Sequence, residues 1–152
     1  MPYIAENFNT YAASGSPADL IAARDHQAYC GLSLGGMTSY GSVATHCIDY
    51  ISYIGTFSGG PFQKSVHELA EMYKANCGDY KLNYWYATAG TAEGGATGIN
   101  TFVQVRDEFG LQFGSDIKNG DSGEYVVVNG TAHNYATWIT ALYNVMHVFF
   151  KK

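Results

Sequence analysis

Two kinds of hydrophobic pattern alternate along the chain, and their alternation predicts four strand–helix pairs. Short apolar runs bounded by turn-forming residues predict strands over residues 26–32, 53–57, 82–89 and 124–128. Longer stretches with apolar residues three or four positions apart predict helices over residues 34–46, 64–76, 99–109 and 134–150. This order predicts a single α/β domain over residues 1–152, with a short parallel sheet in a three-layer α/β/α arrangement.

The remaining segments add three expectations. A short helix over residues 17–24 follows Ser16, which is a suitable N-cap. Residues 90–98 are rich in glycine and predict a loop. The last helix is expected to bury one stripe of side chains, consisting of Trp138, Leu142, Val145 and Phe149.

The first predicted strand ends in Gly31-x-Ser33-x-Gly35, a pattern typical of a nucleophile elbow. In an elbow a buried strand stops, the chain turns sharply and a helix begins, so the serine hydroxyl stands clear of the sheet. The flanking glycines avoid collisions with the neighbouring backbone. The Leu34 amide then lies at a helix N-terminus, where N–H groups favour developing negative charge. The alternative interpretation of this segment is an ordinary glycine-rich turn.

A serine nucleophile needs a base, and the base needs an acid that holds its tautomer. Ser33, Glu93 and His133 occur in the order nucleophile, acid, base that α/β-hydrolases use, and each follows a predicted strand. Because the carboxyl ends of parallel strands meet at one end of a sheet, we expect the three side chains to converge there. Asp116 and Asp121, in the loop before the last strand, are alternative acids.

Other chemistry is less well supported. His26 lies at the start of its predicted strand and belongs to the opposite end of the sheet, while His46, His67 and His147 fall on helices. A cysteine nucleophile at Cys30 is disfavoured because it lies inside a strand, where nothing would lower the pKa of its thiol. No spacing of histidines and carboxylates predicts a metal site, and no cofactor is expected.

Composition narrows the classes of partner. The net charge of −5 provides no basic stripe for nucleic acid. Aromatic residues make up 15% of the chain, which suits either a carbohydrate-binding surface or a tyrosine-rich core.

No apolar run is long enough for a membrane span. The first residues lack a signal-peptide pattern, so the chain is expected to stay inside the cell or to be a mature or trimmed form. The three cysteines are expected to be reduced and mostly buried, although one disulfide with a free thiol is an alternative.

Four segments together resemble carbohydrate esterase family 1, the feruloyl and acetylxylan esterases related to esterase D. Residues 23–36 (ARDHQAYCGLSLGG) are similar to the family segment R-x-H-R-A-x-x-G-x-S-M-G-G, and residues 47–59 (CIDYISYIGTFSG) to the stretch that follows it. Residues 90–93 (GTAE) fall at the family's acid loop, and residues 130–138 (GTAHNYATW) match its G-x-x-H-x-x-x-x-W histidine motif.

The resemblance implies an α/β-hydrolase with Ser33 as nucleophile, His133 as base, Glu93 as acid and Leu34 as an oxyanion-hole amide. It implies a plant cell-wall ester as substrate, with Trp138 as a packing or pocket residue. It also suggests secretion, which the first residues do not indicate.

The chain departs from the family in one respect. The matching members have a further N-terminal half, which supplies several strands and the other oxyanion-hole amide. The first predicted strand would therefore be a bare sheet edge, open to pairing with another chain. We expect either the C-terminal part of a longer esterase or a minimal hydrolase completed by self-association, most simply as a dimer across that edge.

Three functions follow for testing. The first is a serine esterase acting on feruloyl or acetyl esters of cell-wall carbohydrate. The second is a general short-chain esterase with a small acyl pocket, and the third is a non-catalytic domain that binds sugar or a partner through its tyrosine-rich surface.

Overall fold

The sheet consists of four parallel strands in a computed structural model that describes residues 23–151. The strands are β1 (Ala28–Leu32), β2 (Tyr53–Phe57), β3 (Tyr84–Gly90) and β4 (Gly123–Val128), and they lie side by side in chain order. The parallel sheet predicted from the hydrophobic pattern is therefore confirmed.

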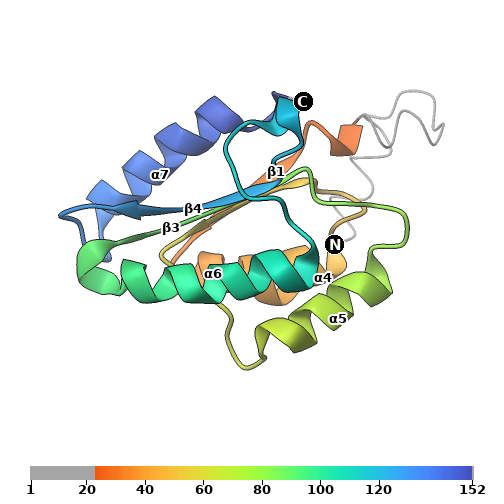
Figure 1. Cartoon of the computed structure of the whole chain (residues 1–152), viewed down its shortest axis with the longest axis horizontal. Helices are drawn as coiled ribbons and strands as arrows, with labels where there is room; N and C mark the ends of the chain where they lie inside the picture. The colour runs from red at the N-terminus through yellow and green to blue at the C-terminus, as the bar shows by residue number, and fades with distance from the viewer. Residues whose placement is uncertain (1–22, 152) are drawn as a thin grey trace.

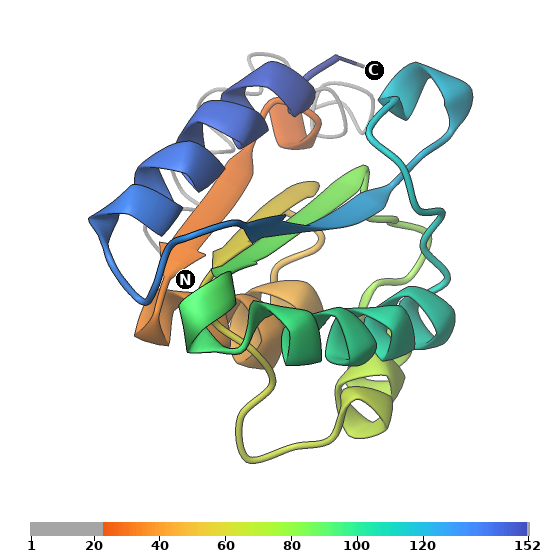
Figure 2. The same cartoon turned by 60° about the vertical axis from the view of Figure 1, so that its left-hand side comes forward.

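Helices cover both faces of this sheet. The segment from Leu34 to His46 is helical and consists of α3 (Leu34–Thr38), the π-helical turn η1 (Ser39–Val43) and α4 (Ala44–His46). This segment lies on one face with α5 (Val66–Asn76) and α6 (Gly95–Phe109), whereas α7 (Tyr135–Val148) lies on the other (Figures 1 and 2). Two 3₁₀ turns, η2 (Thr91–Glu93) and η3 (Ile117–Asn119), complete the described elements. The three-layer prediction is confirmed.

Alternation along the central strands divides the core into two clusters. Ile54 and Trp85 belong to the cluster under α4, α5 and α6, while their neighbours Tyr53, Tyr84 and Tyr86 belong to the cluster under α7. Successive strand residues point to opposite faces, so a strand covered on both sides is apolar throughout. Tyr84, Trp85 and Tyr86 are accordingly all fully buried.

Strand β1 forms one border of the described sheet and is partly uncovered. Because Leu32 lies beside Phe57 in register, alternate residues Ala28, Cys30 and Leu32 face the α7 layer. All three are exposed. Among residues 23–151, β1 pairs with β2 alone, as expected for the open edge.

Some element boundaries differ from those predicted. The first strand begins two residues after the predicted start, because the His26 and Gln27 amides bond to the carbonyls of Ala23 and Arg24 in a turn. The helix predicted from residue 64 begins at Val66, since Ser65 and Glu68 form a capping box. Most of the helix predicted over residues 17–24 lies outside the described residues.

The predicted loop over residues 90–98 is wrong in its second half, because α6 already begins at Gly95. The glycines there allow close packing rather than loop formation. A Cβ on Gly95 would lie 2.8 Å from the Gly90 carbonyl oxygen, and one on Gly98 would overlap the Tyr125 hydroxyl. Glycine signals a loop in sequence, but here it lets the helix approach β4.

The predicted stripe on the last helix is also partly wrong. Val145 and Phe149 are buried with Ala141, but Leu142 is 49% exposed. At 3.6 residues per turn the buried face passes through residues 137, 141 and 145, which turns Leu142 outward.

Candidate active site

Ser33 occupies the sharp turn between β1 and α3. Its φ of 53° and ψ of −113° place a non-glycine residue in a strained conformation. The Ser33 amide donates to the Phe57 carbonyl at 2.9 Å, which fixes the turn to the end of β2, and the Ser33 carbonyl accepts from the Met37 amide at 3.1 Å. The strand–turn–helix geometry of an elbow is therefore present at the predicted serine.

Glycine is required beside this turn for steric reasons. A Cβ on Gly31 would overlap the Gly35 carbonyl, because the strand and the first helical turn pass very close to one another. Leu34 is the first residue of α3 and is 72% exposed. The first amides of a helix have no intrahelical acceptor, so the N–H of Leu34, the residue directly after Ser33, has no acceptor within α3.

His133 lies in the loop between β4 and α7 and bonds to Ser33. The His133 Nε2 atom is 2.9 Å from the Ser33 Oγ atom, and about half of its side chain is exposed. The loop that carries it is held by the Thr131 hydroxyl, which donates to the Val128 carbonyl, and by Asn134, whose side chain caps α7. Both bonds restrict the backbone on either side of the histidine.

Glu93 lies on η2, directly after β3, and bonds to the other side of the imidazole. Its Oε2 atom is 2.7 Å from His133 Nδ1. Its Oε1 atom accepts from the Gly90 amide at 2.6 Å and from the Ser58 hydroxyl at 2.7 Å. The loops of Glu93 and His133 are also joined directly, since the Ala92 amide donates to the Thr131 carbonyl.

The surroundings of Glu93 favour its ionised form. Burial alone would raise the pKa of Glu93, but hydrogen bonds from Gly90, Ser58 and His133, together with the charge of His133, outweigh it and lower the pKa. An ionised carboxylate accepts the Nδ1 proton of the imidazole, which leaves Nε2 free to accept a proton from Ser33. The three predicted side chains thus form one continuous hydrogen-bonded relay.

The alternative residues lie elsewhere. Asp116 caps η3 and Asp121 accepts from the Asp116 amide, so both lie ahead of β4, at the opposite end of the sheet from His133. Burial of the Cys30 thiol raises its pKa to about 11, outweighing a hydrogen bond with the Gly55 backbone that lowers it, although the residue as a whole is exposed; such a thiol is a poor nucleophile.

The other histidines have local partners. His26 stacks against Phe150, His46 contacts the Thr45 hydroxyl, His67 contacts Glu108, and His147 contacts the Tyr143 carbonyl. Of the three cysteines, none of which forms a disulfide, only Cys47 is buried as a whole residue, so the expectation of mostly buried cysteines is wrong.

Trp138 and Ser58 complete the surroundings of the relay. The Trp138 indole lies edge-on to the His133 ring, with ring centroids 5.3 Å apart, and its N–H donates to the Ser58 hydroxyl at 2.9 Å. Ser58 was not identified from the sequence, because it opens the turn-forming run Ser-Gly-Gly-Pro. Its position directly after a strand, like those of Ser33 and Glu93, is the signal that marks it.

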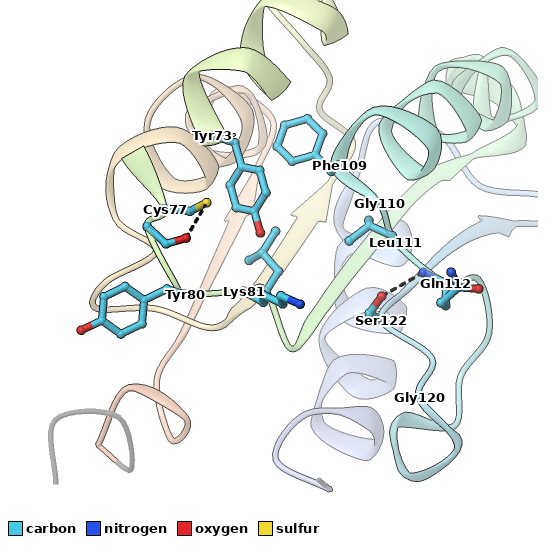
Figure 3. Close-up of a pocket in the computed structure, with 12 residues that line it drawn as sticks. Tyr73, Cys77, Tyr80, Lys81, Phe109, Gly110, Leu111, Gln112, Gly120 and Ser122 are labelled. Atoms are coloured by element: carbon cyan, nitrogen blue, oxygen red, sulfur yellow. Dashed lines mark hydrogen bonds between the residues drawn. The ribbon is translucent and has the colours of Figure 1, made fainter. Parts of the chain in front are cut away.

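A hollow at the opposite end of the sheet contains none of these residues. It lies between the last turns of α5 and α6 and the chain leading into β3 and β4, with Tyr73, Tyr80 and Phe109 among its lining side chains (Figure 3). Within residues 23–151 there is no cluster of three or more potential metal ligands, and no described helix is long and apolar enough to cross a membrane.

The layered parallel sheet and the elbow serine are those of an α/β-hydrolase fold, and solved structures agree. The feruloyl esterase module from Clostridium thermocellum, solved as a serine-to-alanine variant complexed with sinapinate, superposes with a TM-score of 0.76 and 22% sequence identity over 93% of this chain and 51% of that chain. A second solved structure, described as FAE, gives the same TM-score, identity and coverage. The chain thus has the α/β fold of a feruloyl esterase over about half of its neighbours' length.

Sequence comparison finds a curated relative of this chain. Endo-1,4-beta-xylanase Y of Acetivibrio thermocellus is 23% identical over 156 aligned residues, which cover 99% of this chain and 14% of that protein. No family model matches the chain. The resemblance noted in the sequence is therefore supported by both comparisons, and the chain spans only part of each of these three proteins.

Proposed function

We propose that the protein is a serine esterase that hydrolyses carboxylic esters of plant cell-wall carbohydrate, such as feruloyl or acetyl esters. The observation that carries this proposal is the relay from Ser33 Oγ through His133 to Glu93, with distances of 2.9 and 2.7 Å. The fold shared with a feruloyl esterase module supports the choice of an ester of this kind. The general short-chain esterase and the non-catalytic binding domain remain as outcomes of the test.

The proposed reaction has two steps. In the first, Ser33 Oγ attacks the ester carbonyl carbon while His133 Nε2 takes its proton, and the Leu34 amide faces the developing oxyanion. The tetrahedral intermediate then expels the carbohydrate, whose ester oxygen receives the proton from His133 and becomes a hydroxyl group. The acyl group remains on Ser33. In the second, water attacks the acyl carbonyl with His133 as base, which releases the carboxylic acid and returns the proton to Ser33. Glu93 holds the imidazole tautomer throughout.

The test is labelling by a fluorophosphonate probe together with hydrolysis of p-nitrophenyl acetate and methyl ferulate. We expect the wild type to be labelled and to hydrolyse both esters, and the Ser33→Ala variant to lose labelling and at least about 10³-fold in kcat. Ser42→Ala is the control, because Ser42 is an exposed serine on η1. Equal slow turnover by the wild type and Ser33→Ala would contradict the proposal.

The two substrates separate the alternative functions. Hydrolysis of p-nitrophenyl acetate without methyl ferulate would replace the cell-wall ester by a short acyl ester. Absence of labelling would favour a non-catalytic binding domain.

We also propose that a second copy of this chain covers the uncovered side of β1. The α7-facing residues of β1 are exposed, and α7 presents an outward apolar stripe consisting of Ile139, Leu142, Tyr143 and Met146. The α7 sequence contains no Asp, Glu, Lys or Arg, so two copies of this surface meet without like-charge repulsion. An open edge strand is a template for pairing, and a two-fold dimer closes it.

A further inference from the structure

The Ser58 hydroxyl has only one possible arrangement of its proton. The indole N–H of Trp138 can only donate, so Ser58 Oγ accepts from it at 2.9 Å. The lone hydroxyl proton of Ser58 must therefore point to Glu93 Oε1, an acceptor at 2.7 Å. A directed chain runs from Trp138 through Ser58 to Glu93.

The Ser58 hydroxyl is held in place by an energetically unfavourable backbone conformation. Ser58 has a φ of 52°, in the left-handed region that serine rarely adopts, and the residue is 91% buried. Its amide donates to the Thr88 carbonyl at 2.8 Å, which ties it to β3 next to the loop of Glu93. A buried serine kept at an unfavourable φ is expected where its side chain has a defined task.

The Glu93 carboxylate divides its two oxygens between two tasks. Oε1 receives the Gly90 amide and the Ser58 hydroxyl, so Oε2 is the oxygen turned to His133 Nδ1, 2.7 Å away. Without the Ser58 contact, the Gly90 amide and His133 alone would restrain the last torsion of Glu93, which is broad for glutamate. The Ser58 hydroxyl therefore adds a third restraint on the plane of the carboxylate, which keeps one of its two equivalent oxygens directed at His133 Nδ1.

Trp138 contacts His133 directly and reaches Glu93 through Ser58. Its indole N–H holds Ser58, and its ring lies perpendicular to the His133 ring at an interplanar angle of 89°. Because Trp138 follows His133 by five positions at the start of α7, the helix that ends the histidine loop also carries its support.

We propose that Ser58 and Trp138 are positioning residues of this site: the indole of Trp138 holds the Ser58 hydroxyl, and the hydroxyl fixes the Glu93 carboxylate in the orientation that His133 requires. This inference rests on the proposed function. It assigns to Trp138 a role behind the reacting atoms, where the sequence resemblance implied packing or a place in the substrate pocket.

The experiment uses the full chain with the variants Ser58→Gly, Trp138→Phe and their combination. Glycine readily adopts a φ of 52°, so Ser58→Gly removes the hydroxyl without straining the fold. Phenylalanine keeps an aromatic ring beside His133 and removes the N–H. Tyr135→Phe is the control, because Tyr135 is 71% exposed on the same helix.

We expect each single variant to lose about tenfold in kcat on p-nitrophenyl acetate, the effect of one hydrogen bond to a charged group, with KM nearly unchanged. The double variant should be no worse than either single one, since Trp138 acts through Ser58. Wild-type kcat in both single variants, or losses that multiply to about a hundredfold in the double variant, would overturn the inference.

A second measurement does not depend on turnover. The low-field proton resonance of His133 Nδ1–H, identified by its loss in Glu93→Gln, should shift or broaden in Ser58→Gly and Trp138→Phe but not in Tyr135→Phe. An unchanged resonance in the first two would also overturn the inference. Failure of Ser33 labelling in the wild type would instead contradict the proposed function, so the two failures are distinguishable.

Discussion

Glu93 is the residue at which the support from three loops meets. Its carboxylate contacts the Ser58 hydroxyl after β2, the Gly90 amide at the end of β3 and the His133 ring after β4. The side chain is only 10% exposed, so these hydrogen bonds replace water as the partners of its charge. The pKa of Glu93 is lowered because their combined effect exceeds the cost of burial.

The lowered pKa gives a prediction for stability against pH. A carboxyl whose pKa is lower in the folded than in the unfolded chain adds stability above its ordinary pKa of 4.5, and this contribution is lost as the pH falls through the folded value. We therefore expect the free energy of unfolding of the wild type to fall more steeply than that of Glu93→Gln below about pH 5. Urea denaturation at several pH values measures both.

Glu124→Gln is the comparison of opposite sign. Burial raises the pKa of Glu124, so ionising this carboxyl costs stability as the pH rises. The free energy of unfolding of Glu124→Gln should therefore rise relative to that of the wild type as the pH increases above about pH 5. Parallel curves for all three proteins would contradict the assigned directions.

The elbow shows how one element depends on close backbone contact. Strand β1 and the first turn of α3 approach so closely that a side chain at Gly31 has no space beside Gly35. The strained Ser33 lies between them and is held by the Phe57 carbonyl from β2. The position of the Ser33 hydroxyl therefore depends on packing between elements as well as on the local turn.

We expect Gly31→Ala to lower the free energy of unfolding by about 1–3 kcal/mol, as overpacking does. It should also reduce fluorophosphonate labelling, because the elbow must open to admit the methyl group. Gly41→Ala is the matched control, since Gly41 lies in the same helical segment and a Cβ there meets nothing within 4 Å. Urea denaturation compares the two variants, and equal losses in both would contradict the steric argument.

The centres of the elements could be predicted from the sequence, but their ends depended on tertiary contacts. β2 (Tyr53–Phe57) has its predicted bounds because its apolar run lies between Ser52 and the turn-forming residues that begin at Ser58. Gly95 and Gly98 instead resembled loop residues, and only the approach of α6 to β4 explains them. Leu142 fell on the predicted stripe, but the sheet is contacted by the face that contains Ala141.

The convergence of Ser33, Glu93 and His133 could be predicted because it follows from topology: three loops leave the same end of a parallel sheet. Ser58 leaves that end too, but a serine before two glycines and a proline resembles an ordinary turn. Its role depends on the rotamers of Glu93 and Trp138, which no spacing encodes. The sequence likewise could not show that Asp116 and Asp121 bond within their own loop.

For the whole molecule, the uncovered side of β1 raises the question of assembly. Light scattering after gel filtration should give twice the chain mass of 16.5 kDa. Ile139→Glu, on the outward stripe of α7, should shift the protein to monomer, because it places a charge at the contact. Ile99→Glu is the control, since Ile99 is 40% exposed on α6 in the opposite layer. A wild-type monomer would contradict the dimer.

The hydrogen bond between His133 and Ser33 joins residues that are 100 positions apart. All three crossovers of the sheet lie between them, so the two atoms meet only after every strand has found its neighbour. A reagent that reports on this contact therefore counts correctly assembled molecules. In a refolding experiment, the fraction of chains that such a reagent modifies would measure the yield of the native topology without a separate structural probe.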